Sequence, residues 1–364
     1  MVQLIEFDEQ LIGDGYEYTI GVSAVDLTCN GYPDLVSTDT GVGLYWYENT
    51  GTGNFIKHVI HKKENEWLER HAIADINNDG KPEIINIDNI NGSVLWFEYD
   101  GDPRKADSWS YHYVCEGTLP GAYDVAVADF DQDGELEIIA ASWIKGNRFD
   151  YFDRKDGEWR QTTLDDDELR DTRMVRAVDM NGNGKPDLVG TATKSDLLLW
   201  YENIGDPFTN TWARHIIDKP ISPHHGEAVS FTSNRNPDIL IATRGSDDGT
   251  GSEISWYENL GNDNWEKHII IEPFPLASVA IAADIDGDGQ LEVLATGWGE
   301  KGNLSLFKHR GNPRGKWDQQ IIKSDWSKAA QVIALDMDLN GKLDIVACAE
   351  RGSNELRLWR NISP

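Results

Sequence analysis

A nine-residue acidic motif recurs along the whole chain and constrains its fold more than any other feature. The motif has the form D-x-D/N-x-D/N-G-x-x-D/E and is followed by an apolar run, as in DINNDGKPEII and DIDGDGQLEVL. With weaker copies such as DLTCNGYPDLV and SFTSNRNPDIL included, it begins at positions 26, 75, 129, 179, 230, 284 and 336, spaced by 49 to 54 residues. A fixed period of this length indicates one structural unit repeated seven times.

Two further segments follow each motif and complete the unit. One is an aromatic stretch ending in a turn, such as LLWYENIG at 198–205, and the other has the pattern W/F-x-x-H/Q-x-I, such as WARHII at 212–217. Four short strands with Gly-rich turns in each period are typical of a β-propeller blade. The last copy lacks its outer strand, but FDEQLI near the N-terminus fits that pattern.

We therefore predict an all-β chain that forms a single domain over residues 1–364. The domain is a seven-bladed β-propeller of four-stranded antiparallel blades. The N-terminal strand, residues 5–13, completes blade seven and closes the ring, which leaves no exposed sheet edge.

The composition is strongly acidic and limits the partners. Lys and Arg number 33 and Asp and Glu number 63, which gives a formal net charge of −30. Such a surface repels phosphate backbones and anionic lipids, so we expect no nucleic-acid partner and no membrane insertion. The three cysteines imply no disulfide framework. We expect a monomer.

The repeated motif resembles the FG-GAP (VCBS) repeat family, known from integrin α-subunit heads, fungal propeller lectins and several carbohydrate-active enzymes. The resemblance covers essentially the whole chain, because the motif recurs in register. It implies a seven-bladed propeller with calcium loops. It does not imply one activity, since a fold does not fix a function.

The acidic motifs also have the residue spacing of calcium loops. Ca²⁺ takes about six to eight oxygen ligands, and alternating carboxylates with a turn glycine supply them. Loops three and six carry four carboxylates, loops two and seven three, and loop four two, so we predict affinity in that order, then loop one, with loop five empty. The competing interpretation is an Asx-rich turn that folds without metal. The candidate ligands are Asp75, Asn77, Asp79, Glu83, Asp129, Asp131, Asp133, Glu137, Asp179, Asn181, Asn183, Asp187, Asp284, Asp286, Asp288, Glu292, Asp336, Asp338, Asn340 and Asp344.

The calcium loops have a predicted structural role, and they favour a secreted or periplasmic location. The N-terminus shows no signal-peptide pattern, so an intracellular location stays open.

The repeat sorts the histidines into two groups. Four of them share one slot of the outer strand and are predicted to be structural: His58, His112, His215 and His268. Three others precede the acidic motif on the innermost strand, which rings the mouth of the central channel in a propeller. With neighbouring rim residues they give the candidate catalytic set His71, Tyr123, Arg173, His224, His225 and Arg244.

Other polar and aromatic residues of the same rim and its loops are candidates for substrate binding. They are Glu69, Arg70, Asp88, Asp124, Trp143, Lys194 and Trp298. Tryptophans above a polar mouth can stack on sugar rings, although packing between blades is an equally good interpretation. For Arg176 and Glu227, one strand position deeper, we predict an ion pair between blades.

These residues favour a lyase or dehydratase-type eliminating enzyme that acts on an acidic or oxidised sugar. Arginines such as Arg173 and Arg244 would neutralise the sugar carboxylate, His71 or His225 would act as base, and Tyr123 as acid or base. The set is similar to that of propeller polysaccharide lyases and the propeller part of aldos-2-ulose dehydratase. The alternatives are a lectin-like propeller that binds carbohydrate or protein without turnover, and a hydrolase with paired carboxylates.

Overall fold

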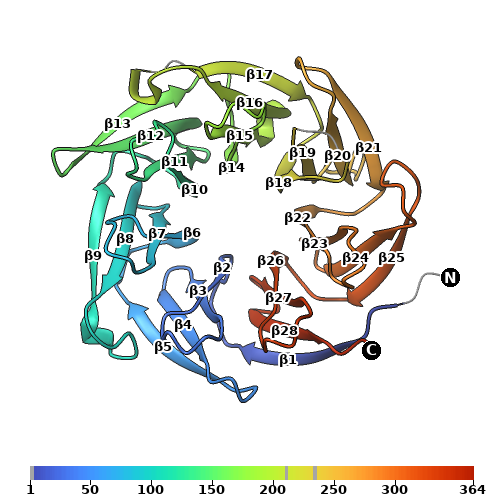
Figure 1. Ribbon diagram of the computed structural model, residues 1–364, viewed down its shortest axis with the longest axis horizontal. Coiled ribbons are helices and arrows are strands. Elements are labelled where there is room, and N and C mark those ends of the chain that lie inside the picture. The colour runs from blue at the N-terminus through green and yellow to red at the C-terminus, as the bar shows by residue number, and fades with distance from the viewer. Residues whose placement is uncertain (1–3, 210–211, 233–235) are drawn as a thin grey trace.

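The computed structural model describes residues 4–209, 212–232 and 236–364. These residues form 28 strands and three short 3-10 helices, and no helix among them is long and apolar enough to span a membrane. Figure 1 shows sheets of four strands arranged around a central axis, with the first strand of each repeat innermost. This radial arrangement is that of a β-propeller.

Four sheets follow the chain in order, each made of four consecutive antiparallel strands. Their strands are β2 (Val22–Val25), β3 (Asp34–Asp39), β4 (Gly43–Asn49) and β5 (Phe55–His61); β6 (Leu68–Ala74), β7 (Glu83–Asp88), β8 (Ser93–Tyr99) and β9 (Trp109–Cys115); β10 (Ala122–Ala128), β11 (Glu137–Ser142), β12 (Arg148–Lys155) and β13 (Glu158–Asp165); β14 (Thr172–Val178), β15 (Asp187–Ala192), β16 (Leu197–Asn203) and β17 (Trp212–Asp218). The helical turns are η1 (Ala106–Ser108), η2 (Thr193–Ser195) and η3 (Pro207–Thr209).

The next two repeats share one eight-stranded sheet, because a single parallel pairing of His225 with Val279 joins them. Their strands are β18 (Pro223–Val229), β19 (Asp238–Thr243), β20 (Glu253–Asn259) and β21 (Trp265–Ile271); β22 (Ala277–Ala283), β23 (Glu292–Gly297), β24 (Asn303–His309) and β25 (Trp317–Lys323).

The last sheet combines both ends of the chain. It contains β26 (Ala329–Leu335), β27 (Asp344–Ala349), β28 (Glu355–Asn361) and β1 (Phe7–Gly13), in the order β1-β28-β27-β26. Strand β1 runs antiparallel to β28, with Phe7 opposite Asn361 and Gln10 opposite Leu358. The sequence placed this N-terminal strand at residues 5–13, and the predicted four-stranded antiparallel sheets are present.

The core lies between neighbouring sheets. The second strand of each repeat is buried along its whole length, and the aromatic third strand packs beside it. Third-strand tryptophans stack on the outer-strand histidines: the ring centroids of Trp46 and His58 lie 4.5 Å apart, and those of Trp200 and His215 lie 4.3 Å apart. Each histidine also contacts a glutamate of its own blade, as His58 Nε2 does with Glu48 at 3.0 Å. The outer-strand histidines are therefore packing residues.

Candidate active site at the channel mouth

The innermost strands bring one equivalent residue from each of the seven repeats to the channel mouth. These residues lie six positions before the acidic motif and line a cavity of about 150 Å³, which we call the mouth pocket. They are Ile20, Glu69, Tyr123, Arg173, His224, Ser278 and Ala330. Loop residues complete the wall: Trp143, Arg244, Trp298, Glu350 and Arg351. The wall is thus built from positions that repeat in the fold and differ in chemistry.

Arg173 organises one side of the mouth pocket. Its Nη1 donates to the hydroxyl oxygen of Tyr123 at 3.2 Å and to Nε2 of His224 at 3.0 Å, while Asp171 holds Nε at 2.9 Å. Nδ1 of His224 donates to the carbonyl oxygen of Ser278 at 2.9 Å, so the proton lies on Nδ1 and Nε2 is an acceptor. Burial, with Arg244 and Arg173 nearby, holds the pKa of His224 well below its ordinary value. His224 is a neutral, fixed imidazole.

Two carboxyl groups face this cluster. Glu69 is only 3% exposed; Trp67 donates to its Oε1 at 2.8 Å, and Oε2 has no hydrogen-bond partner among the described residues. Burial raises the pKa of Glu69 to about 8, against the lowering effect of the Trp67 hydrogen bond and of Arg70 and Arg173. Glu69 therefore carries its proton at neutral pH. Glu350, also buried, accepts a hydrogen bond from the Trp298 indole.

Four guanidinium groups reach the mouth pocket, and they differ in their partners. Arg173 is paired with Asp171, and Arg351 contacts Glu350 and donates to Tyr18 at 3.2 Å. The guanidinium of Arg244 stacks 4.9 Å above the Trp298 ring, but the described residues give it no ion pair, and its Nε is buried without a hydrogen bond. Burial and the charge of Arg173 lower the pKa of Arg244. A buried guanidinium without a carboxylate is costly unless a ligand supplies one.

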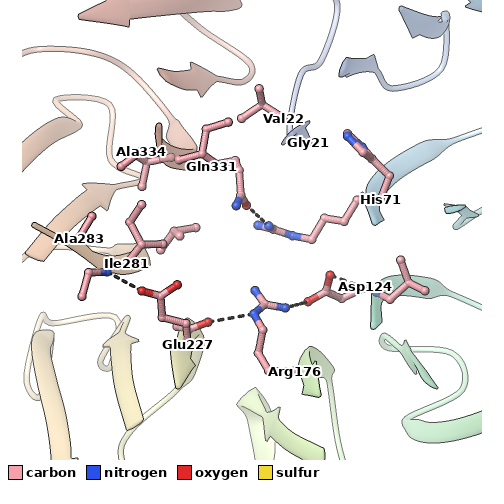
Figure 2. A pocket seen from close by; sticks show the side chains of 17 residues that line it. Gly21, Val22, His71, Asp124, Arg176, Glu227, Ile281, Ala283, Gln331 and Ala334 are labelled. Carbon is pink, nitrogen blue, oxygen red and sulfur yellow. Dashed lines mark hydrogen bonds and ion pairs between the residues drawn. The ribbon is translucent and has the colours of Figure 1, made fainter. Parts of the chain in front are cut away.

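Arg70 separates the mouth pocket from a second cavity deeper in the channel. Its Nη1 hydrogen-bonds the side-chain oxygen of Gln331 on β26, and it lines both cavities. The deeper cavity, which we call the inner chamber, has a volume of about 370 Å³. Figure 2 shows it with His71, Asp124, Arg176 and Glu227 on one side and Ile281, Ala283 and Ala334 on the other.

The inner chamber has its own ion pair. Nη1 of Arg176 contacts Oδ2 of Asp124 at 2.9 Å, and its Nε donates to the carbonyl oxygen of Gly226 at 3.0 Å. Glu227 instead accepts a backbone hydrogen bond from Ala282 at 2.5 Å, so the predicted ion pair between Arg176 and Glu227 is not found. Burial raises the pKa of Glu227 to about 7. Arg176 therefore contacts both neighbouring repeats, through an ion pair with Asp124 on β10 and a hydrogen bond to Gly226 on β18.

The structure divides the sequence-predicted residues into three groups. Eight line the mouth pocket: Glu69, Arg70, Tyr123, Trp143, Arg173, His224, Arg244 and Trp298. His71 and Asp124 lie in the inner chamber. Three line neither cavity: Asp88, which accepts the backbone N–H groups of Trp67 and Asn91, Lys194, which is exposed in η2, and His225.

Two of these histidines are poorly placed to reach the mouth pocket. His225 is 0% exposed, and neither ring nitrogen has a hydrogen-bond partner among the described residues. Its ring stacks on Tyr123, with centroids 5.8 Å apart. His71 points its Nε2 to Ser23 Oγ at 2.7 Å, and burial together with Arg70 lowers its pKa to about 4. Both are neutral.

Sequence reasoning missed several residues of this site. Tyr18 lies two positions before Ile20 at the entrance to the first repeat, and Asp171 fixes Arg173 from the turn before β14. Both lie in turns that face the mouth, so a systematic alignment of those turns was the signal that could have found them. Glu350 and Arg351, in the loop after β27, were placed on the mouth face by the sequence but were not included among the candidate site residues.

Comparison with known proteins agrees with the repeat architecture. The model of the FG-GAP-like repeat matches residues 26–86, 75–140, 231–295 and 284–347, which together make up more than half of the chain. The chain belongs to the FG-GAP-like repeat family. No curated protein matches it in overall sequence.

Solved structures similar to this FG-GAP-like chain show the same fold at low sequence identity. An ancestral GH74 enzyme matches with a TM-score of 0.65 and 13% identity over 95% of this chain, which spans only 48% of that enzyme's chain. The protein BBS1N, solved in complex with ARL6DN, matches with a TM-score of 0.62 and 9% identity over 98% of this chain and 96% of its own. At these identities the likeness concerns the fold alone.

Carboxylates of several FG-GAP-like loops lie close enough together to hold a cation. In loop three, oxygens of Asp129, Asp131, Asp133 and Glu137 lie within 4.8 Å of one another. Burial raises the pKa of Glu137 to about 8, and the charges of Asp131 and Asp129 add to the rise. Three carboxylates converge equally closely in loops two and seven. This donor set fits Ca²⁺.

Loops four, five and six differ from loops two, three and seven. In loop six, the ammonium of Lys308 contacts Asp286, lies 2.9 Å from Asp288 Oδ2 and lies 3.6 Å from Glu292 Oε1. Loop four offers Asp179 and Asp187 with two asparagines. Loop five, predicted to be empty, includes residues 233–235, which lie outside the described part of the chain.

Proposed function

We propose that this chain is a carbohydrate-active eliminating enzyme of the carbon–oxygen lyase or dehydratase type, acting on an acidic or oxidised sugar in the mouth pocket. The observation that carries the proposal is Arg244: its guanidinium is partly buried and forms no ion pair with the described residues, in a chain of net charge −30. A sugar carboxylate would supply that partner in a bidentate contact. The Trp298 indole, on which the Arg244 guanidinium stacks, lines the same pocket and would contact the bound sugar.

The remaining residues of the mouth pocket supply proton transfer. In an elimination, a base removes the proton on the carbon beside the carboxylate, and the C–H electrons form a carbon–carbon double bond. The C–O bond at the next carbon breaks, and its oxygen takes a proton from an acid. Tyr123, whose hydroxyl oxygen accepts a hydrogen bond from Arg173, is the proposed base. Glu69 is the proposed acid, since it holds its proton at neutral pH.

One observation favours the alternative of binding without turnover. The imidazole of His224, the only histidine in the mouth pocket among the described residues, has both nitrogens engaged by Ser278 and Arg173. A base of this kind is not free to accept a substrate proton. In the lectin-like alternative, the mouth pocket therefore binds an acidic sugar without catalysing a reaction.

The same proposal includes the architecture and the metal. We propose a single seven-bladed domain whose ring the β1–β28 pairing closes, with structural Ca²⁺ in loop three and then in loops two and seven. The close approach of several carboxylates in each of these loops supports the metal. We propose that the protein is a monomer located outside the cytoplasm, that it binds no nucleic acid and that it does not insert into a membrane.

The test mixes the protein and Ca²⁺ with free uronic acids and uronic-acid polysaccharides and follows the near-ultraviolet absorbance of an unsaturated uronate. Rising absorbance with the wild type, lost in Arg244→Gln, is the expected result. The matched control is Arg310→Gln, because Arg310 is 65% exposed and pairs with Asp318 away from the mouth. No absorbance change with any substrate, together with calorimetric binding of one of them, would replace the enzyme by the lectin-like alternative.

A further inference from the structure

The shape of the mouth pocket limits how a ligand can enter it. All seven repeats contribute at least one residue to its wall, so the wall runs around the whole channel axis. Its floor is Arg70, which is 5% exposed and whose guanidinium is tied to Gln331. Its volume, about 150 Å³, corresponds to roughly five water molecules at about 30 Å³ each.

We infer that the mouth pocket admits a single acidic sugar unit end-on, so that the ligand is a free sugar acid or the terminal unit of a chain. An internal unit of a polymer carries a glycosidic bond on both sides and needs two openings, whereas a pocket with a complete wall and a floor offers one. This inference rests on the proposed function, because it takes the ligand to be an acidic sugar.

The loops above the wall strengthen the restriction. Trp143 and Trp298 stand over the pocket from the loops after β11 and β23, and each has a cation above its ring: Arg173 at 5.0 Å and Lys328 at 3.7 Å. Glu350 holds the Trp298 indole by a hydrogen bond. These contacts fix both indoles, so the wall does not open by a simple side-chain rotation.

The experiment separates this inference from the proposed function. Calorimetry is done first with a free uronic acid and with a long uronic-acid polymer whose termini are chemically capped. Binding of the free acid at least ten-fold tighter per unit than the capped polymer is expected. Equal binding of the capped polymer would overturn the inference and leave the proposed function standing, whereas no binding of any acidic sugar would overturn the proposed function.

If turnover occurs, product size gives a second measurement. Release of single unsaturated units while the long chains persist is the expected pattern. An early ladder of oligomers with a rapid loss of viscosity would contradict it. Gln331→Ala removes the hydrogen bond that holds Arg70 at the floor of the pocket. It should reduce several-fold the preference for a ligand of one sugar unit over a ligand of two units. The control Gln319→Ala, on the outer strand β25, should leave this preference unchanged.

A second, independent observation concerns loop six. Near the end of its third strand, each of the first five repeats carries an acidic side chain at the same repeat position. These residues are Glu48, Glu98, Asp153, Glu202 and Glu258. In the sixth repeat the residue at this position is Lys308, whose ammonium contacts three carboxylates of the loop. Only three loop-six carboxylates converge, against four in loop three.

We propose that Lys308 takes the place of the metal ion in loop six, so that this loop binds no Ca²⁺ although its carboxylate count equals that of loop three. An ammonium among the carboxylates satisfies the same electrostatic need as a cation, and a second positive charge in the same space would be repelled. Carboxylate count alone therefore misranks the loops.

Bound calcium per chain, measured by equilibrium dialysis and elemental analysis, tests this proposal. Asp131→Asn in loop three should lower the count by one, whereas Asp286→Asn in loop six should leave it unchanged. Lys308→Met should raise the count by one, and the further Asp286→Asn change should remove that gain. The control Lys301→Met should have no effect. A loss of one ion on Asp286→Asn in the wild-type background would overturn the proposal.

Discussion

The outer strands and the channel mouth are built from the same repeat but use it in opposite ways. A histidine of the outer strand recurs in several blades together with a tryptophan and a glutamate of the third strand, and each of these histidines is stacked and paired. At the mouth, the seven equivalent positions carry seven different residue types. Four side chains that line the mouth pocket have a buried polar atom without a hydrogen-bond partner among the described residues: Glu69, Arg70, Trp143 and Arg244. In a repeat protein, a position that breaks the repeat and leaves charge unsatisfied marks the place where a ligand is expected.

Among the changes that test the difference between the outer strands and the mouth, Tyr123→Phe should have the largest effect, on the turnover rate. If the mouth does chemistry, loss of the hydroxyl should lower the turnover rate roughly 10²–10⁴-fold, because a proton-transfer group contributes about that much. Ligand affinity and melting temperature should change little, since the ring that packs on His225 is retained. Steady-state kinetics combined with calorimetric binding checks both parts. Unchanged turnover would remove Tyr123 from the site.

A change in the repeated layer should act on stability instead. Trp46 is 0% exposed and stacks on His58, so Trp46→Ala should cost about 3–5 kcal/mol of unfolding free energy. Denaturant unfolding followed by circular dichroism measures this cost. At a temperature where the variant is still folded, ligand binding at the mouth should equal that of the wild type. A selective loss of binding would show that the two regions are coupled.

The pH dependence of stability tests the buried carboxyl of Glu69. Its pKa is raised from 4.5 to about 8, so the folded state keeps a proton that the unfolded state loses. Stability therefore falls as pH rises from about 4.5 to about 8 and is level above that. Glu69→Gln removes this contribution, and the variant should gain stability relative to the wild type over the same window, by on the order of a few kcal/mol. Equal pH profiles would show that Glu69 is ionised in the fold.

The smallest expected effect is that of His58→Ala. The loss of one stacking contact and one partly exposed contact with Glu48 should cost about 1 kcal/mol. Thermal melts measure the difference, and turnover and binding should stay at wild-type values. A larger loss of activity than of stability would contradict the structural role of this histidine.

Much of the fold could be predicted from the sequence, because the same pattern occurs seven times. A segment whose structure is ambiguous in one repeat can therefore be assigned from its counterparts in the others. The acidic motif located each innermost strand, and the aromatic and outer patterns located the strands after it. The N-terminal strand was placed by the missing outer strand of the last repeat, and it pairs with β28. A chain without repeats offers no such cross-check between its segments.

The candidate site was predicted only in part. The position of a residue within its repeat indicates its level along the channel, but not where its side chain points or how far it extends. His224 and His225 are adjacent, yet alternation along β18 sends one to the mouth pocket and encloses the other. His71 lies two positions further along its strand than Glu69; it lines the inner chamber and hydrogen-bonds Ser23. Lys308 was missed because the loop residues were compared among repeats while the third-strand residue facing them was not.

The pairing of β1 with β28 has a consequence for how the protein is made. Phe7 is synthesised before its partner Asn361, from which 354 positions separate it. Each of the other sheets draws its strands from a short, continuous stretch and can assemble as soon as that stretch is free. The sheet that pairs β1 with β28 must wait until all the strands between them have been made, and until then the edges of β1 and of the incomplete last sheet are open to other chains. A nascent chain stalled before β28 should therefore be the species most prone to aggregate.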